Sequence, residues 1–155
     1  MQHAIWIIVL VISLVIIQGT PSIINIDGMR GIAESGSLIS TANGAILSRD
    51  NYQQTTSSQL TVANWEAELR TMGSPLPNNA GFAWDYGLTS GVGNYFCVQS
   101  NIAPSDYTLK VINRLQERLQ FTAYVDETCG AVADMPAATD LTTLSSLSLT
   151  IYVGG

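Results

Sequence analysis

The chain begins with a long run of apolar positions that shows no period. Residues 4–17 are almost all apolar, as expected for a helix buried in lipid or among other helices. At 1.5 Å per residue this stretch spans about 21 Å, which is short of the hydrocarbon thickness of about 30 Å. Gly19, Thr20 and Pro21 interrupt the pattern, and proline disfavours helix at the preceding residue. We therefore predict a marginal membrane anchor over residues 1–26, with a kink or break over residues 18–22.

A second stretch, over residues 27–49, has apolar positions mostly three and four residues apart. This spacing predicts an amphipathic helix. The apolar positions are Ile26, Met29, Ile32, Ala33, Ile39, Ala42 and Ile46. Glycines at positions 28, 31, 36 and 44 weaken such a helix by roughly 1 kcal/mol each relative to alanine. Two interpretations of these glycines stay open, a loop or a close helix–helix approach in an assembly.

The remaining pattern predicts a globular head over residues 50–155. Residues 50–60 are polar and predict a connector, and a short helix follows that is capped by Thr61, with Trp65, Leu69 and Met72 on one face. Aromatic-rich strands are expected over residues 81–88 and 94–99, joined by a glycine-rich turn. A helix over 105–119 and strands over 121–125 and 147–153 complete the order.

This order of elements predicts an α+β fold. A long N-terminal hydrophobic helix, broken near Pro21, continues into the amphipathic helix and packs on an antiparallel sheet with short helices. The head over residues 50–155 would then be one domain, and residues 1–49 an extended helical element.

The charge of the chain limits the classes of molecule that it is expected to bind. Charged residues make up 12% of the chain and the net charge is −6, with no basic cluster, so direct nucleic-acid binding by one subunit is not expected. No Lys or Arg precedes Arg30, whereas a signal peptide begins with a basic region. We therefore expect that a basic leader has been removed and that Met1 is a processed end.

The two cysteines, Cys97 and Cys129, predict one disulfide. Such a bridge contributes roughly 3–4 kcal/mol in the chain-entropy model. The alternative is a pair of buried free thiols in a cytosolic protein, which the apolar N-terminal segment disfavours. A metal site built on two cysteines needs further ligands, and His3 is the only histidine, so no metal is expected.

Candidate catalytic groups are few. With His3 as the sole histidine and far from any nucleophile in sequence, histidine-based triads are excluded. No phosphate-binding loop or other cofactor motif is present, so neither an enzyme nor a cofactor is expected. Carboxylate pairs occur at 66/68, 126/127 and 134/140, and we interpret them as solvated or turn residues. The aromatic residues favour a core over a ligand cleft. They are Trp84, Tyr86, Tyr95 and Phe96.

Several segments together resemble mature type IV pilins, in particular the type IVb and conjugative, shufflon-associated pilins. The apolar N-terminal helix, the proline at position 21 and the α+β head follow the architecture of that family. Short segments of the head are also similar. They are residues 48–52 (SRDNY), 60–64 (LTVAN), 69–77 (LRTMGSPLP), 95–98 (YFCV) and 127–130 (ETCG).

The resemblance implies a structural role. The subunit is held in the inner membrane before assembly and then joins a helical filament of identical subunits on the cell surface, with the help of pilus assembly machinery. The N-terminal helices pack against one another in the filament core, and a methylated Met1 is expected. The core-packing residues are Ile5, Trp6, Ile8, Val9, Leu10, Ile12, Leu14, Val15 and Ile16.

Position 5 departs from the family pattern. Most major pilins carry a glutamate there that is thought to pair with a neighbour's N-terminal amine, whereas this chain has Ile5. The departure leaves a minor or tip subunit as an alternative to a major one. A membrane-anchored extracytoplasmic binding domain that never polymerises is a further alternative, and a secreted domain with an unusual signal peptide is another.

Overall fold

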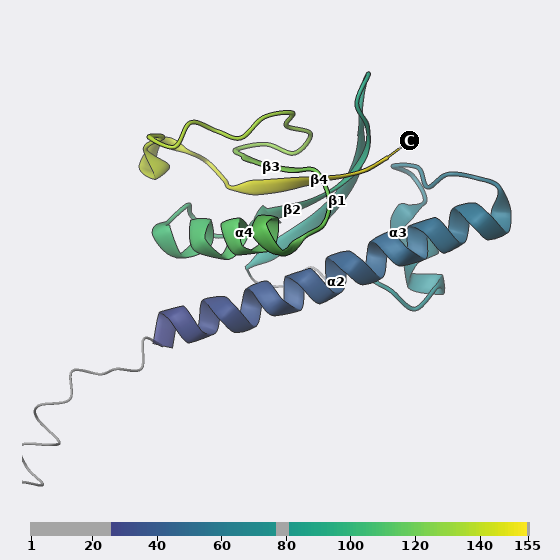
Figure 1. The fold of residues 1–155 in the computed structure, drawn as a ribbon, viewed down its shortest axis with the longest axis horizontal. Coiled ribbons are helices and arrows are strands. Elements are labelled where there is room, and N and C mark those ends of the chain that lie inside the picture. The colour runs from purple at the N-terminus through teal and green to yellow at the C-terminus, as the bar shows by residue number, and fades with distance from the viewer. Residues whose placement is uncertain (1–25, 77–80, 155) are drawn as a thin grey trace, which may run out of the picture.

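The computed structural model of the chain describes residues 26–76 and 81–154, with side chains from Arg30 onward. The fold of these residues is α+β, as predicted, with three α-helices and one four-stranded antiparallel sheet (Figure 1). The elements are α2 (Ile26–Thr56), α3 (Trp65–Thr71), β1 (Phe82–Thr89), β2 (Gly93–Ser100), α4 (Asp106–Arg118), β3 (Ala123–Asp126), a 3-10 turn η1 (Leu141–Thr143) and β4 (Ser148–Gly154).

The predicted N-terminal features lie outside the described residues. These are the apolar helix over residues 4–17, the processed Met1, the break at Gly19, Thr20 and Pro21, and all of the residues expected in a filament core. Within residues 26–76 and 81–154, none of the helices combines the length and apolar character that crossing a membrane requires.

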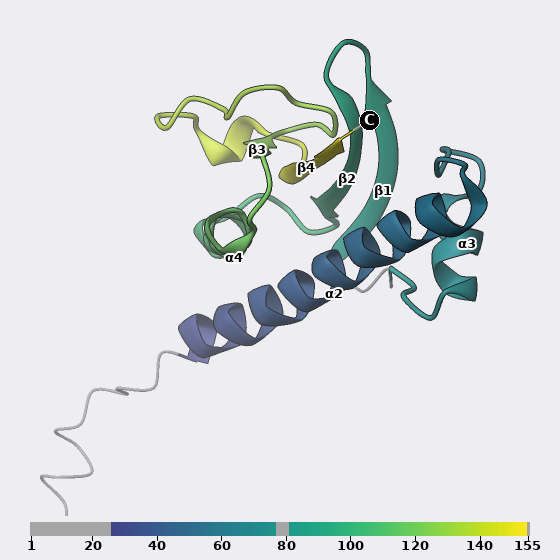
Figure 2. The same cartoon turned by 45° about the vertical axis from the view of Figure 1, so that its right-hand side comes forward.

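The sheet has the order β1-β2-β4-β3, so the last strand of the chain is central. Helices α2 and α4 lie under one face, and the long loop between β3 and β4 lies over the other (Figures 1 and 2). Because side chains alternate across a strand, the register places Tyr86 beside Phe96 and Val98 beside Leu149 on the helical face. These side chains form the core with residues of both helices.

Helix α2 is longer than the sequence pattern predicts. The polar connector expected from residue 50 is wrong over its first half, because the helix runs on to Thr56. Thr55 and Thr56 donate side-chain hydrogen bonds to the carbonyl oxygens of Asn51 and Tyr52 at 2.8 Å, so their hydroxyls are satisfied within the helix. Ser57 then adopts a positive φ of 54°, a left-handed conformation that commonly ends helices.

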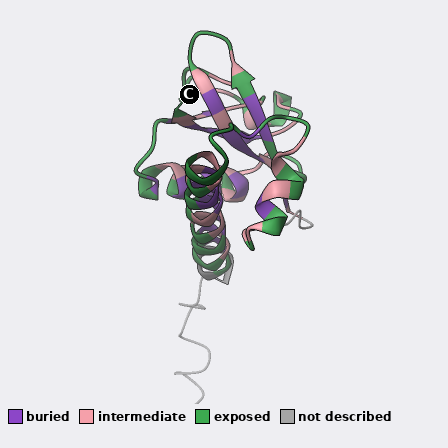
Figure 3. Ribbon diagram, turned by 90° about the vertical axis from the view of Figure 1, so that its right-hand side faces the viewer, coloured by how far each residue is buried: buried purple, intermediate pink, exposed green. Residues whose placement is uncertain are grey.

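The buried face of α2 differs in part from the predicted one. Ile32 and Ala33 were expected to be buried, yet both are exposed, and Ile32 keeps 57% of its surface exposed. Ser35 and Leu38 are buried at positions that were not predicted, whereas Ala42 and Ile46 are buried as predicted. Figure 3 looks nearly along α2 and shows exposed residues around much of its circumference.

One glycine of α2 lies against α4. At Gly31 an added Cβ would lie 3.4 Å from the Tyr107 ring of α4, so the small face of α2 lets α4 approach closely. Gly36 has open space around its Cα, and Gly44 has only the Ser74 hydroxyl nearby at 3.8 Å. The loop interpretation of these described glycines is therefore wrong, and the close approach occurs within one chain at Gly31.

Helix α4 begins at a capping box, whereas the N-cap of α3 makes no side-chain capping hydrogen bond. In α4, Ser105 accepts a hydrogen bond from the Thr108 backbone and Thr108 caps the Ser105 backbone in return, which is the reciprocal arrangement of a capping box. Ile112 and Leu115 are buried as predicted. In α3 the expected cap at Thr61 is wrong, because the N-cap is Asn64. The Asn64 side chain instead accepts from the backbone and hydroxyl of Thr61, closing a turn before the helix.

Small shifts separate the predicted from the observed strands. The predicted strand over 121–125 begins two residues later as β3, and Phe121 is exposed at 38%. Trp84, Tyr86 and Phe96 are core residues, as predicted. Tyr95 is not, because its position on β2 places it on the opposite face, where its ring packs edge-on against Tyr152 at 5.9 Å.

Candidate functional site

A disulfide joins β2 to the loop that covers the outer face of the sheet. Cys97 and Cys129 are bonded, with their Cα atoms 5.7 Å apart, a separation typical of unstrained bridges. Cys97 is fully buried. The predicted disulfide is therefore confirmed among the described residues, and it anchors the start of the covering loop to the second strand.

A cluster around Tyr152 holds the same loop against the β1–β2 hairpin. The Tyr152 hydroxyl lies 2.9 Å from the Thr89 hydroxyl and 3.1 Å from the carbonyl oxygens of Gly130 and Ala131. The Gly130 backbone amide donates to the Thr150 hydroxyl at 2.9 Å. Gly130 has a φ of +88°, a conformation that side chains rarely allow. Disulfide, hydroxyls and turn together make this region of the loop rigid.

Of the predicted carboxylate pairs, Glu66 and Glu68 lie in the first turn of helix α3, whereas Glu127 and Asp140 lie in turns of the covering loop. Glu127 accepts hydrogen bonds from the backbone and hydroxyl of Ser145 at 2.9 and 2.7 Å, and these bonds lower the pKa of its carboxyl. Asp140 caps η1 by accepting from Thr142, whose side-chain and backbone bonds lower the pKa of Asp140. Hydrogen bonds to a carboxylate favour its charged form, so both groups stay ionised near neutral pH.

The third loop carboxylate protects the free edge of the sheet. Asp134 accepts from the β3 backbone amide of Val125 at 2.8 Å and from the side chain of Gln116 at 2.9 Å. The next residue, Met135, donates its backbone amide to the Val125 carbonyl at 2.7 Å. An edge strand covered in this way is a poor template for pairing with another chain.

Arg49 is a buried positive charge that sequence reasoning missed. It lies in α2 and donates to the carbonyl oxygens of Val153 at 2.5 Å and Gly154 at 2.8 Å, at the end of β4. It also pairs with Asp50 at 3.0 Å. Burial raises the pKa of the nearby Tyr86 hydroxyl, and the charge of Arg49 opposes that rise. No periodicity could have assigned this role, since the partners are more than a hundred residues away.

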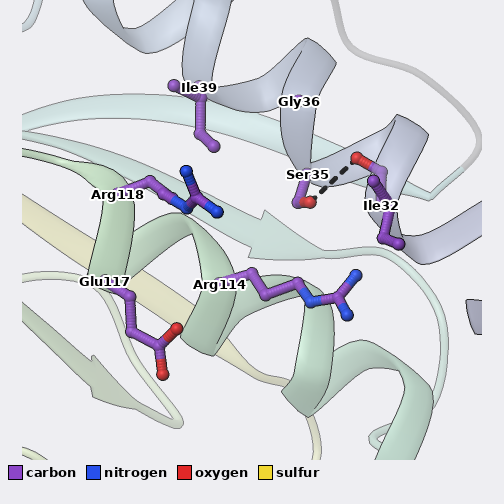
Figure 4. Close-up of a pocket in the computed structure, with 7 residues that line it drawn as sticks. All are labelled: Ile32, Ser35, Gly36, Ile39, Arg114, Glu117 and Arg118. Carbon is purple, nitrogen blue, oxygen red and sulfur yellow. Dashed lines mark hydrogen bonds between the residues drawn. The ribbon is translucent and has the colours of Figure 1, made fainter.

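A groove runs between α2 and α4. Ile32, Gly36 and Ile39 form its α2 side, and Arg114 and Arg118 extend toward α2 from the other side (Figure 4). The carboxylate of Glu117 points away from α2 in the same view. A second hollow continues the groove along Leu47 and Phe121. The surface thus combines exposed apolar side chains with two guanidinium groups.

The groove places apolar and basic side chains next to one another. Among the described residues, no three side chains of the types that hold metals lie close enough together to do so. Its two cations, Arg114 and Arg118, could have been found from sequence, because they are four residues apart and share one side of α4 with Lys110. The exposure of Ile32 beside them could not, because the sequence pattern placed that residue on the buried face.

Comparison of this chain with known protein families, with curated proteins and with solved structures found no match.

Proposed function

We propose that this chain is a structural subunit of a filament of the type IV pilus class. The proposal rests mainly on one side of α2, whose apolar residues Ile32 and Leu47 are not covered by the rest of the described chain. This helix follows the apolar segment of residues 4–17 in the sequence, buries one face against the head, and leaves Ile32 and Leu47 exposed at 57% and 69% along another. Apolar side chains left exposed on one helix can form part of an interaction surface.

The proposed mechanism is a transfer of apolar surface from lipid to protein. Before assembly, residues 4–17 lie in the inner membrane and the head lies outside it. On assembly the same residues pack among those of other copies, which keeps their apolar surface away from water. The short apolar segment lowers the cost of extraction, since each buried CH₂ contributes about 0.8 kcal/mol. The loop held by the disulfide and Tyr152 gives the head a rigid outer surface.

A charge in the apolar segment tests this proposal. Leu10→Asp should abolish filaments, because an unpaired buried charge costs several kcal/mol. The matched control is Val62→Asp, since Val62 is an apolar head residue that is 64% exposed and should tolerate a charge. Electron microscopy of sheared surface material reads both out. Filaments of normal yield from Leu10→Asp, or no filament containing the wild-type chain, would refute the proposal.

Ile5 favours a second candidate within the same class, a minor or tip subunit. Without the glutamate, a copy cannot neutralise a neighbour's N-terminal amine during docking. Antibody labelling of filaments distinguishes the two roles, because a major subunit is labelled along the whole length and a tip subunit only at one end. Mass spectrometry of the mature chain adds an independent check, since the pilin proposal requires a methylated Met1.

A further inference from the structure

Three basic side chains form an unpaired stripe along α4. Lys110, Arg114 and Arg118 are four residues apart, and all three are exposed. None of them makes an ion pair or a hydrogen bond to any described residue, whereas Arg49 and Arg70 both do. Half of the six basic residues of the chain therefore lie on one side of one helix without a partner.

The stripe borders an apolar strip on α2. Ile32 and Ile39 lie across the groove from the two arginines (Figure 4), and Leu47 and Phe121 extend the strip at 69% and 38% exposure. An apolar centre with cations at its rim is the usual composition of a protein-binding surface.

The charge that would complement this stripe lies elsewhere in the same chain. Residues 119–154 contain Asp126, Glu127, Asp134 and Asp140, and no Lys or Arg. The internal hydrogen bonds of these carboxylates all go to one of the two oxygens, so the second oxygen stays without a described partner. The covering loop is thus a rigid acidic surface.

One copy does not bring these two surfaces together. The loop contacts α4 through Gln116, which bonds to Asp134, whereas Arg114 and Arg118 extend toward α2 on the other side of the helix (Figure 4). The basic stripe and the acidic loop are different surfaces, so their pairing between copies is heterologous, and such contacts form open filaments when they do not close into rings.

We propose that the α2–α4 groove of one copy binds the acidic loop of residues 126–140 of a second copy. Arg114, Arg118 and Lys110 pair with the loop carboxylates, while Ile32 and Ile39 are covered by the loop. This inference rests on the proposed filament and names the contact between neighbouring heads within it. Charge complementarity fixes the direction of the contact, since two grooves or two loops would repel each other.

Lys110 makes the contact directly measurable, because it is the only lysine of the chain. A carbodiimide condenses an amine with a carboxylate that already touches it, leaving an amide and no spacer. Assembled full-length chain is prepared from a mixture of ¹⁴N- and ¹⁵N-labelled copies and treated with this reagent. The expected product is a mixed-label peptide pair that joins Lys110 to one of the loop carboxylates. Pairs from a single label only, such as Lys110 with Asp106, would overturn the proposal.

Two variants test the energetic role of the stripe. Arg114→Gln with Arg118→Gln should lower the yield of the mixed-label product roughly fivefold, since exposed ion pairs are individually weak. Arg70→Gln is the matched control, because Arg70 is an exposed helical arginine on α3 that pairs only with Glu66. The wild-type yield should also fall at 1 M salt, where the screening length shrinks to about 3 Å. Equal yields from the double variant and the control would overturn the proposal.

Microscopy of the same samples separates this inference from the proposed function. Filaments without the Lys110 product would overturn the groove–loop contact and leave the filament intact. The product without filaments would support the contact and refute the filament. The contact would also be overturned if no product formed between copies and phosphatidylglycerol vesicles protected Lys110 from an acylating reagent. That result would assign the stripe to a membrane surface.

Discussion

Replacing Arg49 measures how much its hydrogen bonds between helix α2 and the end of β4 stabilise the fold. In Arg49→Met the aliphatic part of the side chain is kept, while the two hydrogen bonds to the Val153 and Gly154 carbonyls are lost. A hydrogen bond from a charged donor contributes about 1.5–3 kcal/mol. Gly154 is exposed and Val153 half-buried, so water replaces part of this interaction. We expect the free energy of unfolding to fall by about 2–4 kcal/mol.

Urea unfolding of the full-length chain in mild detergent, followed by tryptophan fluorescence, measures this change. Trp65 and Trp84 report on the head, since Trp84 is buried and Trp65 stacks on Tyr86. Arg70→Met serves as the control, because its exposed pair with Glu66 contributes only about 0.3–0.5 kcal/mol. If Arg49→Met were to unfold within about 0.5 kcal/mol of this control, Arg49 would not hold the two elements together.

Further predictions concern the disulfide, the glycines of α2 and pH. Replacing both Cys97 and Cys129 with serine should destabilise the head by about 2–4 kcal/mol, and an unchanged melting temperature would contradict a structural role. Gly36→Ala should raise the free energy of unfolding by about 1 kcal/mol, since the site of Gly36 is open. Gly31→Ala should raise it less, because Gly31 faces the Tyr107 ring. Equal increases in the two variants would argue against the close approach of α4 at Gly31. The pKa of Glu127 in the folded chain is lowered from 4.5. Its contribution to folding stability is therefore present above pH 4.5 and is lost as the pH falls through the folded pKa. On acid titration, Glu127→Gln should lose less stability than the wild type.

The sequence pattern correctly predicts strand β4 but does not indicate the loop that covers one of its faces. Leu149 and Ile151 alternate with polar residues, which correctly indicates a strand with one apolar face. Ser148 and Thr150 occupy the polar positions of this alternation, yet both are fully buried. Their cover is the loop held by the disulfide, and the pattern within a strand carries no information about a segment that folds over it.

The same limit explains the errors in α2. Apolar spacing assigned Ile32 to the buried face, but α4 packs where Gly31 permits its approach, and a glycine carries no hydrophobic signal. The sequence pattern predicts a connector over residues 50–56 because they are polar. In the structure, the hydroxyls of Thr55 and Thr56 bond to carbonyls within the helix, and Arg49 joins this part of α2 to the end of β4. The basic positions of the candidate groove were visible in sequence, and the apolar side opposite them required the structure.

The place of β4 in the sheet has a consequence for the order in which the head can form. Strand β3 pairs only with β4 among the described strands, and β4 follows the other three strands in the sequence. Until it inserts between β2 and β3, one strand has no partner and Arg49 has no carbonyls to bind. The head therefore cannot mature stepwise from its N-terminus, and such long-range closure is slow. A chain truncated before residue 148 lacks β4 and therefore the middle of its sheet. Only chains that include β4 can form the folded head.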